Sequence, residues 1–120
     1  MSDGRERAAD ALAEVHREFR DGLPGRLDSL RRALDRLREG REPAAVESLF
    51  RTAHSLKGTA PSFGAHELAA PAAELTELAR AWREGEGPRD FTELKRARAL
   101  LSRLREAAER FVSRTGEETR

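Results

Sequence analysis

The sequence contains no cysteine and no tyrosine, and aromatic residues make up only 5% of it. Without cysteine, neither disulfides nor thiolate metal ligands are available. Apolar runs are short, and none approaches the roughly 18 residues that a membrane-spanning helix needs. The N-terminal segment MSDGRERAAD lacks the apolar stretch of a secretory signal. These absences predict a soluble, cytoplasmic protein with no membrane partner.

Neither sign of charge dominates the chain. Lys and Arg total 23 residues and Asp and Glu total 22, and the two signs alternate along the sequence. We therefore expect no nucleic-acid partner. The histidines at positions 16, 54 and 66 form no HxxxH or ExxH pair, so no metal site is expected. No nucleotide-binding signature is present, so the chain is not expected to bind ATP or to phosphorylate itself.

Apolar residues recur at alternating steps of three and four, the spacing that lines one side of a helix. At 120 residues, the chain has the length of one domain. We predict an all-α fold, an antiparallel up-down-up-down four-helix bundle with an additional N-terminal helix. The helices are expected over residues 5–21, 24–39, 43–60, 64–84 and 90–112, and residues 1–4 and 113–120 are expected to fray.

Prolines and glycines predict where these helices begin, bend and end. Gly22 and Pro24 predict a bend or a break between the first two helices. Pro43 suits the opening turn of the third, where a backbone N–H is not needed. Pro71 lies inside the fourth, which either is kinked there or begins only near residue 70, and we favour the kink. Asp90 starts the last helix as a cap.

The most informative segment is LFRTAHSLKGTAPSFGAHEL, residues 49–68. At about 100° per residue, Arg51, Lys57 and Gly58 all fall within about 60° of His54 around a helix. These four residues therefore share one face. The opposite face carries apolar residues that point toward the expected core: Leu49, Ala53 and Leu56.

A histidine on such a face suits phosphoryl transfer. Neutral imidazole is a competent nucleophile near neutral pH, because its unperturbed pKa is about 6.5. A cation one turn away, Lys57, can stabilise negative charge on the transferred group. Gly58 leaves room for another active site to approach, although glycine inside a helix costs about 1 kcal/mol relative to alanine.

The motif His54-x-x-Lys57-Gly58, followed by small residues and by Phe63-Gly64 at a helix-helix turn, resembles the phosphoacceptor segment of histidine-containing phosphotransfer (HPt) domains of bacterial phosphorelays. The resemblance covers about residues 15 to 112. It implies that His54 accepts the phosphoryl group, that Lys57 stabilises it, and that Gly58 and Gly64 belong to the site. Arg51 is added to the binding residues because it shares the helix face of His54.

The resemblance also implies partners. These are response-regulator receiver domains and a sensor histidine kinase, and Mg²⁺ is expected on the receiver, with no cofactor bound by this chain. Many relatives carry Gln or Glu at the position of Thr76, where that side chain orients the imidazole. Thr76 is shorter and reaches His54 only if the helices pack closely or a water bridges the gap.

Three functions stay open at the level of sequence. The first is a relay intermediate that exchanges phosphoryl groups with receiver aspartates. The second is a substrate domain of a chemotaxis-type kinase, which usually carries a second histidine where this chain has Ala73. The third is a helical adaptor without chemistry. The absence of that histidine at Ala73, and of the usual glutamate at Thr76, argues against the second function. Retention of His54, Lys57 and Gly58 together argues against the third, so the first is favoured.

Overall fold

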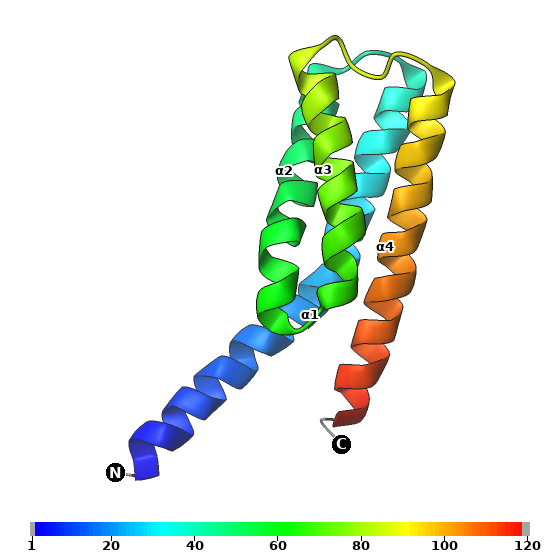
Figure 1. Cartoon of the computed structure of the whole chain (residues 1–120). Coiled ribbons are helices and arrows are strands. Elements are labelled where there is room, and N and C mark those ends of the chain that lie inside the picture. Colours follow the sequence, from blue (N-terminus) through cyan, green and yellow to red (C-terminus); the bar gives the residue numbers. More distant parts are fainter. Residues whose placement is uncertain (1, 119–120) are drawn as a thin grey trace.

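The chain, as a computed structural model that describes residues 2–118, consists of helices joined by short connections (Figure 1). The long helices are α1 (Ser2–Glu39), α2 (Pro43–Thr59), α3 (Ala69–Glu84) and α4 (Phe91–Glu118). Two short 3₁₀ turns, Ala60–Phe63 and His66–Leu68, join α2 to α3. No strand occurs within residues 2–118. The prediction of an all-helical fold is confirmed.

The four helices lie side by side and enclose one core. In Figure 1, consecutive helices run in alternating directions, because their short connections leave no room for a crossover. Helix α2 packs against α1 and α3, and α4 packs against the same two helices from the other side. The most extensive of these contacts joins α2 to α3. The site described below lies on α2 and includes side chains of α3.

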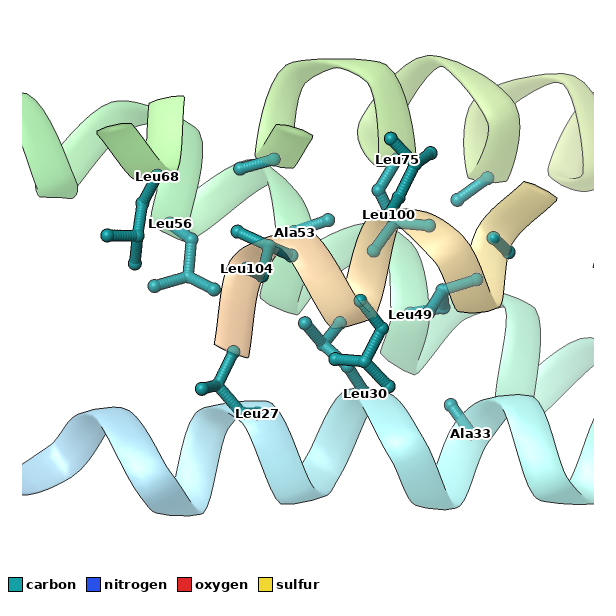
Figure 2. Close-up of a cluster of buried hydrophobic side chains, with 14 of the residues drawn as sticks. Leu27, Leu30, Ala33, Leu49, Ala53, Leu56, Leu68, Leu75, Leu100 and Leu104 are labelled. Carbon is teal, nitrogen blue, oxygen red and sulfur yellow. The ribbon is translucent and has the colours of Figure 1, made fainter. Parts of the chain in front are cut away.

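The core is built from one apolar stripe on each helix (Figure 2). Leu30 of α1, Leu49 of α2, Leu75 of α3 and Leu104 of α4 are all completely buried. Burial of each such side chain is worth about 1.5–3 kcal/mol relative to exposure. Because α2 is held from its apolar side, the direction of its opposite face is fixed.

The two helices predicted over residues 5–21 and 24–39 are one helix, α1, with Pro24 inside it. The separate N-terminal helix is therefore a wrong prediction. Pro24 has no N–H, so the carbonyl of Arg20 loses its helical partner, but the helix continues through the proline. Figure 1 shows the N-terminal part of α1 leaving the bundle at an angle. Leu23 and Leu27, on either side of Pro24, are both buried in the core, so packing holds the helix together through the proline and a bend replaces the break.

The kink predicted at Pro71 is also wrong. Regular helix begins only at Ala69, after the 3₁₀ turn His66–Leu68, so Pro71 lies in the first turn of α3. Its missing N–H costs nothing there, because the first N–H groups of a helix have no intrahelical partner. The earlier start at residue 64 is not observed.

The chain ends also differ from expectation. Helix α1 begins at Ser2 and α4 continues to Glu118, so the described parts of the segments predicted to fray are helical. In the C-terminal segment, Arg114 and Glu117 are good helix formers even without a buried face. Residues 1, 119 and 120 lie outside the described residues. Leu12 and Val15 of α1 are 59% and 45% exposed, because the N-terminal part of this helix projects beyond its neighbours.

Candidate functional site

His54 lies on the outer side of α2. Its side chain is exposed, while Leu49, Ala53 and Leu56 of the same helix are completely buried. Figure 2 shows these three side chains pointing into the cluster shared with the other helices. The helical period thus separates an anchored face from a solvent face. The imidazole is accessible to a second protein without any opening of the bundle.

The two cations near His54 differ in their partners. Arg51 is exposed and its Nε donates to Glu47 Oε1 at 2.9 Å. Lys57 is half-buried, and no acidic group in the described part of the chain pairs with it. Arg51 is therefore partly neutralised by its own helix, whereas the charge of Lys57 is free to meet an anion one turn from the imidazole.

Gly58 is exposed on the same face, one turn after His54. A Cβ atom built there would meet no heavy atom within 4 Å, so the bundle itself does not require glycine at this position. The glycine leaves this part of the helix face open to close approach of a second surface.

Gly64 has a different role. It adopts a φ of 80°, in the left-handed region that disfavours other residues, and its N–H donates to the carbonyl of Pro61 at 3.1 Å. The next N–H, that of Ala65, donates to the carbonyl of Ala60 at 2.9 Å. Gly64 therefore closes the turn between α2 and α3, which explains its identity without any contact to His54.

The structure places Thr76 inside the bundle, completely buried. Its hydroxyl donates to the carbonyl of Ala72, one turn earlier in α3, at 2.7 Å. The hydroxyl proton is thus used within α3 and is not available to the imidazole. No hydrogen bond or ion pair of His54 occurs among residues 2–118. The orienting role considered for Thr76 has no support in this geometry.

Sequence reasoning missed the aromatic neighbour of the imidazole. The rings of Phe50 and His54 are stacked, with centroids 5.6 Å apart and planes 11° apart. From α3, the guanidinium carbons of Arg83 and Arg80 lie 4.0 and 5.3 Å from the Phe50 centroid. The spacing of Phe50 and His54, one turn apart, could have predicted the first contact. The contacts with α3 depend on how the two helices pack.

Among the described residues, no group of three or more His, Cys, Asp or Glu side chains could hold a metal ion. None of the described helices is long and apolar enough to cross a membrane. The site consists of the exposed imidazole of His54, the ammonium of Lys57 without an acidic partner in the described residues, and the open helix face around Gly58.

Comparison with known proteins bears on this arrangement. The family model described as the Hpt domain matches residues 14–107, which include all of α2 and α3 and the residues described above. Comparison with curated proteins and with solved structures finds no significant match.

Proposed function

Since this chain belongs to the Hpt domain family, whose members carry out histidine phosphotransfer in two-component signalling, we propose that it is a phosphorelay intermediate with His54 as phosphoacceptor. His54 accepts a phosphoryl group from the aspartyl phosphate of one receiver domain and passes it to the aspartate of another. The observation that carries the proposal is the exposed imidazole of His54 beside an unpaired Lys57 on a firmly anchored helix.

The transfer step follows from the chemistry of imidazole. The ring nitrogen that carries no proton attacks the phosphorus atom of the aspartyl phosphate, and a nitrogen–phosphorus bond forms. The phosphorus–oxygen bond to the aspartate breaks, and its electron pair leaves with the carboxylate. The other ring nitrogen keeps its proton, so the ring gains positive charge. Reversal of these steps with a second receiver discharges the phosphohistidine.

Lys57 is the stabilising cation in this proposal. The equatorial oxygens of the transferred group carry negative charge, and an ammonium one turn from His54 lowers the energy of that charge. Arg51 is a weaker candidate because Glu47 already pairs with it at 2.9 Å. We expect Mg²⁺ and most of the remaining catalytic groups to come from the receiver domain, as in the family resemblance.

The docking face is the exposed side of α2 that carries His54 and Gly58. With no side chain at this position and no neighbouring atom within 4 Å of a Cβ, a partner can approach the imidazole closely. Such access serves a receiver domain, because the phosphorus atom of its aspartyl phosphate must come within about 3–3.5 Å of the attacking imidazole nitrogen, in line with the leaving oxygen. A kinase domain that phosphorylates His54 directly would need the same access, so the experiment below includes both donors.

The test is transfer of radiolabelled phosphoryl groups from a panel of phosphorylated receiver domains, and from histidine kinases with ATP, to the purified chain. We expect label from receivers, acid-labile and alkali-stable, and none on His54→Gln. The matched control is His66→Gln, which alters another exposed histidine. Circular dichroism checks that both variants fold. Labelling of His54→Gln at the wild-type level would refute the assignment, and labelling by kinases alone would refute the relay.

A further inference from the structure

The feature of interest is the stacked pair of Phe50 and His54. Phe50 is only 9% exposed, so its ring is held in the bundle while the imidazole reaches solvent. The ring planes lie 11° apart at a centroid distance of 5.6 Å, within the range of favourable offset stacking. A fixed ring thus lies against a ring that is otherwise unrestrained.

The second observation is that α3 holds Phe50 in place. The guanidinium of Arg83 lies 4.0 Å from the Phe50 centroid, and that of Arg80 lies 5.3 Å away. Both distances are within the limit for an attractive cation–π contact. The two arginines are themselves restrained by ion pairs, Arg83 with Glu47 at 3.9 Å and Arg80 with Glu77 at 3.4 Å. The ring of Phe50 therefore has neighbours on two helices.

We propose that Phe50, held by Arg83 and Arg80, is the positioning residue that orients the imidazole of His54 for phosphoryl transfer. This inference rests on the proposed function and assigns to α2 and α3 a task for which Thr76 makes no contact, since it forms no hydrogen bond with His54 in the described residues. The hydroxyl of Thr76 donates to Ala72, and no hydrogen bond fixes the imidazole within residues 2–118. Stacking restrains the plane of the ring without using either ring nitrogen.

Orientation matters because the reaction is in-line. The attacking nitrogen must point at phosphorus, and small angular errors reduce the fraction of productive encounters. The imidazole also gains positive charge as the nitrogen–phosphorus bond forms, and the face of an aromatic ring attracts positive charge. The contact therefore strengthens between the ground state and the transition state, which is the condition for a rate effect.

The test compares Phe50→Leu, which removes the ring and keeps an apolar side chain, with Phe50→Tyr, which keeps the ring. Single-turnover transfer from a phosphorylated receiver is measured over a range of receiver concentrations. We expect Phe50→Leu to lower the maximal rate about two- to tenfold, with little change in the half-saturating receiver concentration. Phe50→Tyr should transfer at the wild-type rate.

The matched control is Phe111→Leu. Phe111 is also buried, 5% exposed, and pairs with an aromatic ring, that of Phe19, but it lies on α4. It should show the wild-type rate when folded. A structural readout accompanies the kinetics, namely the ring-current shift of the His54 imidazole protons by NMR. That shift should collapse in Phe50→Leu, decrease in Arg83→Gln, and persist in Phe50→Tyr and Phe111→Leu.

The outcomes separate this inference from the proposed function. If wild type accepts no phosphoryl group, the proposed function fails and the inference fails with it. If wild type transfers normally and folded Phe50→Leu does so too, only the inference fails. It also fails if the whole effect lies in the half-saturating concentration, because Phe50 would then act in docking. An unchanged ring-current shift in Arg83→Gln would overturn the role of Arg83.

Discussion

Replacement of Thr76 by valine tests whether the hydroxyl of this residue serves His54 or only its own helix. Valine has nearly the same shape as threonine and is also β-branched, so the packing between α3 and its neighbours is preserved. The substitution removes one hydrogen bond, the 2.7 Å bond from the Thr76 hydroxyl to the carbonyl of Ala72. In the structure, this bond lies wholly inside α3.

The change in the free energy of unfolding depends on whether Thr76→Val leaves a buried polar group without a partner. The carbonyl of Ala72 retains the backbone N–H of residue 76 as its helical partner, so no buried acceptor becomes unsatisfied. The lost hydrogen bond is worth about 0.5–1.5 kcal/mol net, and an additional apolar group in a completely buried site offsets part of it. We expect the free energy of unfolding to change by less than about 1 kcal/mol and the transfer rate by less than about twofold.

A contrasting variant, Thr76→Gln, introduces the side chain that many relatives carry at this position. Because Thr76 is 0% exposed, the longer amide has no free space and should destabilise the fold by about 1–3 kcal/mol. Urea unfolding followed by circular dichroism measures both stabilities, and single-turnover transfer from a phosphorylated receiver measures the rates. Transfer at least about tenfold slower in a fully stable Thr76→Val would refute the reasoning, because it would require a hydroxyl contact with His54.

Lys57→Ala should slow single-turnover transfer by about tenfold or more, with a urea midpoint close to wild type; an unchanged rate would remove Lys57 from the mechanism. Gly58→Ala should raise the free energy of unfolding by about 0.5–1 kcal/mol, because nothing lies within 4 Å of the new Cβ. Gly58→Leu should mainly raise the half-saturating receiver concentration, and an unaltered value would place docking elsewhere. The Trp82 indole N–H, 2.8 Å from Glu93 Oε2, holds the pKa of Glu93 below its ordinary value. This contribution to stability is therefore complete above about pH 5 and is lost as pH falls through the lowered pKa. In urea unfolding measured at several acidic pH values, Glu93→Gln should reduce the dependence of the free energy of unfolding on pH. The same pH dependence in wild type and variant would contradict the assignment.

The start of α4 is held by one local contact and one tertiary contact. The side chain of Asp90 accepts a hydrogen bond from the N–H of Glu93 at 3.0 Å, as the sequence pattern predicts for a helix start. The carboxylate of Glu93 has another partner, the indole of Trp82 on α3. A cap depends on residues three apart and is readable from sequence, whereas the bond from Glu93 to Trp82 depends on how α3 meets α4.

Helical periodicity is a local property, so the pattern of apolar residues is enough to predict the all-helical class, the apolar face of α2 and the outward direction of His54. The same period also placed Lys57 and Gly58 beside the histidine. The sequence could not determine whether the helix continues through Pro24. The same residues are compatible with a bend or a break, and the packing around them decides which one forms.

The completion of the site depends on how the helices pack against one another. This packing places Thr76 in the core, leaves Lys57 without an acidic partner in the described residues, and brings Arg83 of α3 over Phe50. Each of these outcomes depends on the axial offset and rotation of one helix against another. A side chain is only a few ångströms long, so a small change in this offset makes or breaks its contact with the neighbouring helix. The period of a single helix does not determine the offset.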